Sequence, residues 1–332
     1  MKEAKLYKKL KNKAVQCQAC RWYCAIPNGQ FGICGVRQNI DGKLYLLVYG
    51  KAVGPHLDPI EKKPLYHFLP GTTALSLGTI GCNMQCSFCQ NWQISQEKTI
   101  YQKDFVTPEQ IVYLALKYKS KTIAYTYNEP TIFYPYARDI ALEAKKYGLK
   151  NIFVTNGIES EEVVKDMAGI IDAANVDFKA YDEQYYRREL KAPFSVRETL
   201  QLMKQAGLWV EVTTLIIPGI NDTTEHLEKI AAFIANKLGT ETPWHLSAFH
   251  PDYKMLDKPV TPVTILEKAY ETGQKAGLQF IYIGNVGLRN NITYCPGCHK
   301  PLIKRMGYQI LQNKITDGKC PYCQTKIPGI WN

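Results

Sequence analysis

Three cysteines lie within eight residues at C-x3-C-x2-C spacing: Cys82, Cys86 and Cys89. Three thiolates at this spacing can bind three irons of a cubane 4Fe-4S cluster and leave the fourth iron open. An open metal position accepts a substrate or cosubstrate, whereas a structural metal loop would take a fourth ligand from elsewhere in the chain. The cysteines follow an apolar run over residues 74–80 that predicts a strand. We therefore expect a catalytic iron-sulfur centre at the end of this strand.

Alternating strands and helices are predicted for the middle of the chain. The apolar runs that predict strands are 74–80, 122–126, 151–155, 175–179, 210–217, 244–249 and 279–283. Between them, Thr107-Pro108-Glu109-Gln110 has the N-cap, proline and glutamine of a helix start. Regular alternation predicts parallel βαβ units, and about six consecutive units form a barrel or part of one. Catalytic groups of such a barrel belong at the carboxyl ends of its strands.

Polar residues follow these predicted strands: Asn128 and Glu129, Thr155 and Asn156, Asp177 and Lys179, His250, and Asn285 beside Gly284. Each alone has a structural interpretation, because Asn-Glu-Pro and Asn-Gly form turns and an Asp-Lys pair can close a barrel. Carboxyl ends of parallel strands meet at one rim. Together with the cysteines, these side chains could therefore surround one ligand.

The cysteine motif and the order of these elements resemble the radical S-adenosylmethionine (SAM) superfamily, most closely its branch of pyruvate formate-lyase activating enzymes. The resemblance implies an α/β fold, a partial (β/α)6 TIM-like barrel. It also implies that SAM binds the open iron and that one electron from the cluster cleaves it to a 5′-deoxyadenosyl radical. An electron donor such as ferredoxin or flavodoxin would supply that electron.

The same resemblance implies SAM contacts near the first strands. Phe88 would lie beside the adenine, and Asn128-Glu129-Pro130 takes the place of a Gly-Gly-Glu-Pro element that binds the SAM amino group. This chain lacks both glycines of that element, which restricts the approach of the backbone. Thr155 and Asn156 match a ribose-contacting position.

Further contacts are implied near the later strands. Asp177 and Lys179 match an element that supports the SAM carboxylate and a nearby cation. Gly284 and Asn285 match the adenine platform. His250 would face the substrate, and its alternative interpretation is a satisfied histidine of the core.

The flanking segments narrow the resemblance. Residues 32–37 and 327–331 resemble AmmeMemoRadiSam-system radical SAM enzymes, along with most of the remaining chain. That family name implies Memo-like and AMMECR-like proteins as candidate partners but specifies no reaction. The charged loop at residues 56–68 precedes the first predicted strand and could cover the barrel mouth. The alternative interpretation of its charges is a solvated surface.

Two further cysteine sets predict metal sites outside the barrel. Cys295, Cys298, Cys320 and Cys323 form two C-P-x-C knuckles, which indicate a zinc ribbon. The other set is Cys17, Cys20, Cys24 and Cys34, and its spacing fits either zinc or an auxiliary 4Fe-4S cluster. The predicted domains are therefore an N-terminal metal-binding lobe with a lead-in loop at 1–73, the barrel at 74–290 and the ribbon at 291–332.

Composition limits the class of protein. The 332 residues are 45% hydrophobic, which suits one barrel-sized domain with small appendages. We find neither an apolar run of about 20 residues nor a signal peptide, so we expect no membrane span and a cytoplasmic protein. The net charge of +11 falls to about +6 once metal thiolates are counted. A nucleic-acid partner is therefore not indicated, although it is not excluded.

The sequence thus predicts a radical SAM enzyme that abstracts hydrogen from an unidentified small molecule or protein. One alternative is an activase that acts on a glycine of a partner glycyl-radical enzyme. An alternative of another class is a metal-stabilised module that binds nucleic acid or protein. An intact cysteine triad argues against this last interpretation.

Overall fold

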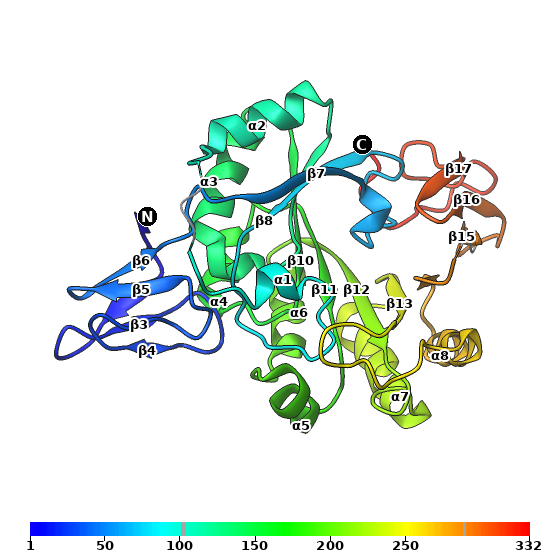
Figure 1. Cartoon of the computed structure of the whole chain (residues 1–332). Coiled ribbons are helices and arrows are strands. Elements are labelled where there is room, and N and C mark those ends of the chain that lie inside the picture. Colours follow the sequence, from blue (N-terminus) through cyan, green and yellow to red (C-terminus); the bar gives the residue numbers. More distant parts are fainter. Residues whose placement is uncertain (101–103, 288–289) are drawn as a thin grey trace.

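The computed structural model describes residues 1–100, 104–287 and 290–332. Its centre is the sheet that includes β7, β8 and β10 to β13 (Figure 1). This sheet has eight strands, with β7 and β14 at its edges. The strands, in their order across the sheet, are β7 (Val53–Pro59), β8 (Thr73–Gly78), β9 (Thr122–Tyr125), β10 (Lys150–Thr155), β11 (Ala173–Asp177), β12 (Trp209–Ile216), β13 (Trp244–Ala248) and β14 (Ile281–Gly284). Strands β8 to β14 are parallel, whereas β7 is antiparallel to β8.

All seven predicted strands are confirmed, and they form the parallel part of this sheet. The sequence did not predict β7, which contains Gly54, Pro55 and Pro59. Proline lacks the N–H that a central strand needs, but an edge strand tolerates it. The α/β class is therefore confirmed, with one more strand at the edge than expected.

Helices connect the parallel strands. They are α1 (Trp92–Ser95), α2 (Pro108–Lys117), α3 (Tyr134–Lys145), α4 (Glu161–Met167), α5 (Glu183–Tyr185), α6 (Val196–Gln205), α7 (Thr224–Phe233) and α8 (Val263–Lys275). The predicted start of α2 is confirmed, because the Gln110 N–H donates to Thr107 Oγ1 and the Thr107 N–H donates to Gln110 Oε1. These connections leave the carboxyl ends of the strands on one side of the sheet.

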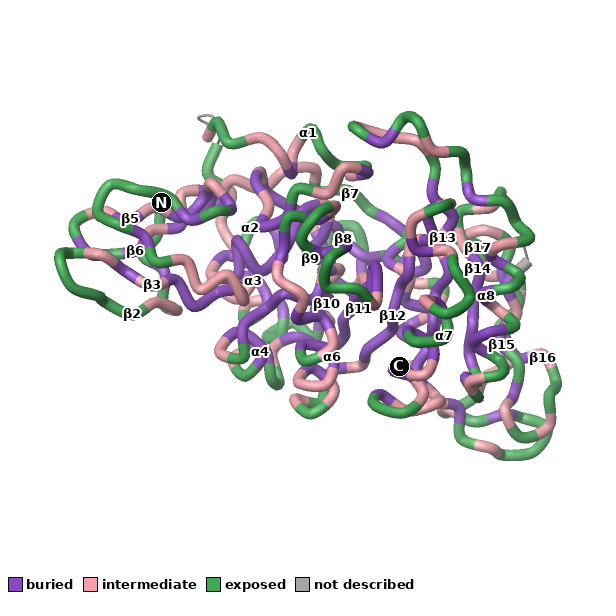
Figure 2. The backbone as a smooth tube through the Cα atoms, turned by 90° about the horizontal axis from the view of Figure 1, so that it is seen from below, coloured by how far each residue is buried: buried purple, intermediate pink, exposed green. Residues whose placement is uncertain are grey.

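The N-terminal lobe consists of short antiparallel strands and lies at one side of the central sheet (Figure 1). They are β1 (Lys2–Glu3), β2 (Tyr7–Lys9), β3 (Val15–Cys17), β4 (Ala25–Ile26), β5 (Arg37–Ile40) and β6 (Lys43–Leu46). The sequence suggested an irregular segment here, since strands of two to four residues are too short for a periodic signal. Buried residues of this lobe, such as Val15 and Leu46, join the core of the barrel. Figure 2 shows that buried residues continue from the lobe into the central strands, while the hairpin tips of the lobe are exposed.

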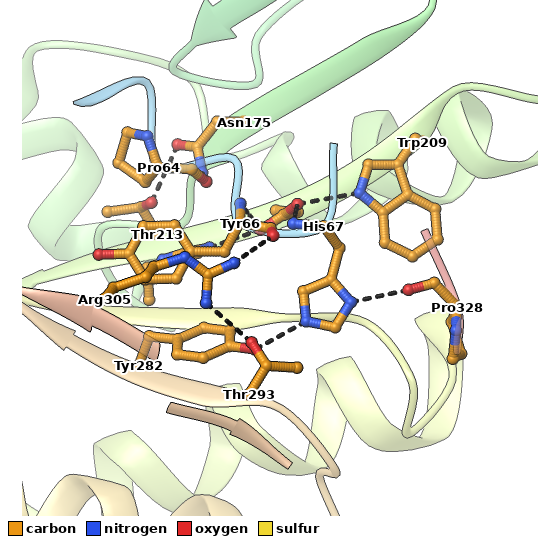
Figure 3. A network of polar contacts seen from close by, with 12 residues as sticks. Pro64, Tyr66, His67, Asn175, Trp209, Thr213, Tyr282, Thr293, Arg305 and Pro328 are labelled. Atoms are coloured by element: carbon orange, nitrogen blue, oxygen red, sulfur yellow. Dashed lines mark hydrogen bonds and ion pairs between the residues drawn. The ribbon is translucent and has the colours of Figure 1, made fainter. Parts of the chain in front are cut away.

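The C-terminal ribbon is an antiparallel sheet of β15 (Asn290–Tyr294), β16 (Pro301–Met306) and β17 (Gln309–Asn313). It has a small core of its own around Leu302 and Ile303. The guanidinium of Arg305 is fully buried and donates to Thr293 Oγ1 at 2.8 Å and to the Tyr66 carbonyl at 2.6 Å (Figure 3). This arginine therefore ties the ribbon to the segment that precedes the first parallel strand.

A buried polar network around His67 completes this attachment (Figure 3). The imidazole of His67 lies 2.7 Å from the Pro328 carbonyl and 2.7 Å from the Tyr282 hydroxyl. The backbone N–H groups of Tyr66 and His67 donate to Glu211, which lies near the amino end of β12. The expectation that loop 56–68 covers the barrel mouth is therefore wrong, because the end of the loop is fixed at the amino ends of the parallel strands, opposite the mouth.

Candidate functional site

A cavity of about 250 Å³ opens at the carboxyl ends of the parallel strands. All three cysteines of the C-x3-C-x2-C motif line it, on the loop that follows β8. The structure brings most of the predicted site residues to this cavity: Cys82, Cys86, Phe88, Cys89, Asn128, Glu129, Thr155, Asn156, Asp177, Lys179 and Asn285. Gly284 ends β14 next to this group but is outside the lining, and so is His250.

The cysteine thiols lie in surroundings that suit a metal cluster better than free thiols. Burial raises the pKa of Cys86 to about 12, although the Lys179 cation opposes this. A bare Cys86 thiol would thus stay protonated, and metal binding would displace its proton. The Ser95 hydroxyl is buried, lies 3.1 Å from the Cys89 sulfur and can donate to a thiolate there. The Asn83 carboxamide is buried beside this loop, and its Oδ1 lies 3.9 Å from the Cys82 sulfur.

Lys179 supplies a buried positive charge beside the cysteines. Its ammonium lies 2.5 Å from Asp177 Oδ2 and 5.9 Å from the centre of the Phe88 ring. Burial would lower the pKa of Lys179, but Asp177 and the thiolate forms of Cys86 and Cys89 raise it above its usual value. The lysine is therefore cationic and can offset the negative charge that thiolates bring to the cavity.

Glu129 holds two strand ends together. Its Oε1 accepts from the Thr131 N–H at 3.0 Å, and its Oε2 accepts from the Asn156 N–H at 2.9 Å. The Thr155 hydroxyl lies 2.9 and 3.0 Å from the two oxygens. Burial raises the pKa of Glu129, while these donors stabilise its ionised form. The carboxylate is thus positioned by the protein and still forms part of the cavity wall.

Glu159 is a second buried carboxyl group behind Glu129, which the sequence did not indicate. Its Oε1 lies 2.5 Å from Thr155 Oγ1, and its Oε2 has no hydrogen-bond partner among the described residues. Burial and the neighbouring Glu129 raise the pKa of Glu159 to about 8. A proton on Glu159 lets two carboxyl groups share one threonine without repulsion.

Asn128 fixes the start of the cysteine loop. Its amide nitrogen donates to the Gly81 carbonyl at 2.8 Å and to Thr79 Oγ1 at 3.1 Å. A Cβ at Gly78 would lie 2.6 Å from the Thr126 carbonyl oxygen and 2.9 Å from Asn128 Oδ1. The loop therefore passes directly against the end of β9.

The rim of the cavity carries the remaining predicted residues. The Asn285 amide donates to the Ala248 carbonyl at 3.2 Å, which holds the end of β14 to β13. His250 is exposed, so its interpretation as a core histidine is wrong. Its Nε2 lies 2.8 Å from the amide nitrogen of Gln90, and Gln90 lines the cavity.

Several lining residues were missed by the sequence analysis: Gln90, Asn91, Ser95, Thr126, Tyr127, Val154, Thr213, Leu215 and Ser247. Thr213, Leu215 and Ser247 could have been found from the alternation of side chains near the carboxyl ends of β12 and β13. Ser95 gives no such signal, because its position depends on how the loop returns to the cysteines.

The C-terminal cysteines converge tightly. The sulfurs of Cys295, Cys298, Cys320 and Cys323 all lie within 4.8 Å of one another, with pairs at 3.5 and 3.7 Å. Four sulfurs at about 2.3 Å from one tetrahedral ion would lie about 3.8 Å apart. A four-cysteine metal site in the ribbon is therefore confirmed, and its geometry fits a single ion.

The N-terminal cysteines form a looser group. Cys17, Cys20 and Cys34 are buried and Cys24 is half-buried. Electrostatic interactions link these thiols to one another. The backbone N–H of Cys17 donates to the Cys24 carbonyl at 2.9 Å.

Comparisons with known proteins agree with this fold and site. Residues 77–234 match the Radical SAM superfamily. An uncharacterized protein of Methanocaldococcus jannaschii is 42% identical over 98% of this chain and 99% of its own length. A pyruvate formate-lyase-activating enzyme of Clostridium pasteurianum is 23% identical over 53% of this chain and 80% of its own length.

Among solved structures, a radical SAM methyltransferase from Sphaerobacter thermophilus has a similar fold. Its TM-score is 0.51 at 14% identity, over 66% of this chain and 68% of that one. The parallel sheet and the cysteine-lined cavity thus define an α/β protein of the radical SAM type. The chain belongs to the radical SAM superfamily.

This membership supports a radical SAM enzyme and implies a 4Fe-4S cluster and SAM. In the part of the chain that the structure describes, we find no helix long and apolar enough to cross a membrane.

Proposed function

We propose that this protein reductively cleaves SAM at a 4Fe-4S cluster bound by Cys82, Cys86 and Cys89, and that the resulting radical abstracts hydrogen from a substrate. The observation that carries this proposal is the convergence of the three cysteines, the Lys179–Asp177 ion pair and Glu129 on one cavity. When bound, the cluster and SAM supply a 5′-deoxyadenosyl radical through a one-electron cleavage.

The residues of the chain prepare the cavity for this chemistry. Three cysteines would leave one iron of the cluster open for SAM, and the Ser95 hydroxyl would donate to a Cys89 thiolate 3.1 Å away. The Lys179 ammonium offsets the negative charge of the cluster and its thiolates. Glu129 is available for the SAM ammonium, because its two oxygens offer about four lone-pair sites and the protein supplies three donor protons: the two N–H groups of Thr131 and Asn156 and the one Thr155 hydroxyl.

Other contacts to SAM follow from position. Phe88, which packs near Lys179, would lie beside the adenine. Thr155 and Asn156 would approach the ribose, and Gly284 with Asn285 would form the platform on the far side of the cavity. His250 at the rim would meet the substrate, and Gln90 orients its ring.

Further components belong to the same proposal. A ferredoxin or flavodoxin would supply the electron, and Memo-like and AMMECR-like proteins are candidate partners. Zinc bound to the ribbon cysteines would stabilise a unit that is too small to fold on hydrophobic burial alone. The distances between the cysteine sulfurs support zinc at this site. This resident ion would be structural, since four cysteines fill a tetrahedral site.

A glycyl-radical activase is the second candidate. Its support is the likeness of the chain to a protein named pyruvate formate-lyase-activating enzyme. A backbone glycine of a partner protein would then replace the small-molecule substrate. A radical on that partner, detected by electron paramagnetic resonance, would distinguish the two candidates.

The test is anaerobic reconstitution of the protein with iron and sulfide, followed by dithionite and SAM. We expect 5′-deoxyadenosine, quantified by mass spectrometry, to exceed the background of a Cys82→Ala variant. Addition of small-molecule or protein fractions from the source cell should then stimulate formation and identify the substrate class. Equal product from the wild type and Cys82→Ala, at full cluster loading of the wild type, would contradict the proposal and favour a binding module.

A further inference from the structure

We propose that the N-terminal lobe binds a second 4Fe-4S cluster, in a site separate from the cavity and in contact with the loop of the first cluster. Its ligands would be Cys17, Cys20, Cys24 and Cys34. The spacing of these residues alone fits either zinc or an iron-sulfur cluster. Three structural observations favour the cluster.

The first observation is where the four cysteines are buried. Cys17 and Cys34 belong to the main core of the protein, the same core that Met84 and Phe88 of the cavity loop enter. Cys295 and Cys320 of the ribbon instead belong to a separate small core. Three of the four thiols of the N-terminal site are thus buried, and two of them belong to the main core, which shields most of the site from solvent.

The second observation is the separation of the sulfurs. Among the residues that the structure describes, the ribbon cysteines are the group of metal-ligating side chains that converges within 4.8 Å. The N-terminal thiols interact through space with one another, as Cys82, Cys86 and Cys89 do. One ion draws four sulfurs into contact, whereas a cubane binds each sulfur at a different iron and keeps them farther apart. The looser arrangement therefore fits a cluster.

The third observation is the contact between the two cysteine loops. The Trp22 indole N–H, from the N-terminal lobe, donates to the Asn83 carbonyl at 2.9 Å. A Cβ at Gly81 would lie 2.7 Å from the Cys34 carbonyl oxygen, so the two backbones are in direct contact there. The Asn83 side chain lies against the thiol of Cys20 and also against that of Cys82. One residue therefore lies between ligands of both sites.

A buried arginine offsets the charge of the proposed site. Arg37 is 2% exposed, and its Nη1 lies 3.9 Å from the Cys17 sulfur. Four thiolates around a 4Fe-4S core leave a net negative charge, which a buried cation stabilises. The same guanidinium donates to the Thr131 and Ile132 carbonyls at 3.3 and 2.9 Å, directly after the Glu129 segment of the cavity wall. The N-terminal site is thus joined to the cavity wall as well as to the cysteine loop.

The test removes the first cluster and asks what remains. The full chain with Cys82→Ala, Cys86→Ala and Cys89→Ala is reconstituted with iron and sulfide without oxygen, and its iron, sulfide and zinc are measured. We expect about four irons and four sulfides per chain, one zinc, and an electron paramagnetic resonance signal after reduction by dithionite. Two zinc ions and background iron would overturn the proposal, and so would one zinc with no second metal.

A second measurement covers the case in which the triple variant does not fold. The reconstituted wild type should bind about eight irons per chain, and a Cys17→Ala and Cys34→Ala variant about four. Wild-type protein that saturates at about four irons would overturn the second cluster. The iron and zinc content tests the second cluster alone. SAM cleavage that depends on Cys82 tests the proposed function, and it can succeed or fail whichever metal content is found.

Discussion

The ammonium of Lys179 lies 2.5 Å from the carboxylate of Asp177, two residues earlier at the carboxyl end of β11. This ion pair brings a cation, held at 9% exposure, to the side of the cavity that Cys86 and Cys89 form. The Asp177–Lys179 pair that the sequence analysis singled out therefore belongs to the cysteine site. The sequence alone also allowed a structural ion pair that closes the barrel.

Replacement of Lys179 by methionine should weaken the cluster site. The substitution keeps most of the side-chain volume but removes the charge that faces the thiolates and leaves Asp177 unpaired. We expect cluster affinity or 5′-deoxyadenosine formation to fall roughly 10–100-fold, as for other residues that support metal ligands. Lys165, an exposed lysine paired with Glu161, gives a matched control in Lys165→Met. Equal losses in both variants would show that Lys179 has no special role.

Ser95→Ala should lower the reduction potential of the cluster in the cavity. The serine hydroxyl lies 3.1 Å from Cys89 Sγ, and hydrogen bonds to cluster sulfurs favour the reduced state. Loss of a hydrogen bond worth about 1 kcal/mol corresponds to roughly 40 mV for one electron. A redox titration followed by electron paramagnetic resonance measures this shift. Ser87→Ala in the same loop is the control, because the Ser87 hydroxyl contacts Glu189; an unchanged potential in Ser95→Ala contradicts the prediction.

Glu159→Gln should remove a pH dependence of stability. The pKa of Glu159 is raised to about 8 by burial and by Glu129. Between about pH 4.5 and 8 the folded protein keeps a proton that the unfolded chain releases, so the free energy of unfolding falls as pH rises. The loss is about 2 kcal/mol between pH 6 and 8. Thermal unfolding of both proteins across this range tests it, and parallel curves would contradict a protonated Glu159.

His67→Gln should remove a pH dependence of stability that has the opposite sign to that of Glu159. Burial lowers the pKa of His67 to about 4, although Glu211 opposes this, and Arg305 and His245 add to the lowering. Between about pH 6.5 and 4 the unfolded chain takes up a proton that the folded protein refuses, so stability falls as pH falls. Zinc and cluster loss at low pH affects both proteins alike. The wild type should therefore lose more stability than His67→Gln, and an equal loss in both would show that His67 does not titrate this way.

The sequence predicted what depends on local pattern. The apolar runs identified all seven parallel strands, and the spacing of Cys82, Cys86 and Cys89 indicated the chemistry before the cavity was known. The parallel order then brought residues as distant as Cys82 and Asn285 to one rim.

Contacts between distant segments could not be predicted in this way. Glu159 became part of the site because Thr155 connects it to Glu129. His67 and Pro328 are 261 residues apart, and no local signal indicates that they meet. Loop 56–68 preceded the first predicted strand, so its charges suggested a cover for the mouth. The strand β7, whose last residues begin that loop, is antiparallel to β8 and directs the chain to the amino ends of the parallel strands instead.

The most direct test of the central claim is whether SAM binds the cluster that Cys82, Cys86 and Cys89 leave with one open iron. The reconstituted and reduced protein would be mixed with SAM carrying ¹⁵N in its amino group and studied by pulsed electron-nuclear double resonance. We predict a ¹⁵N coupling to the cluster that is absent in Cys82→Ala. A fully loaded cluster in the wild type without this coupling would contradict radical SAM chemistry at this site.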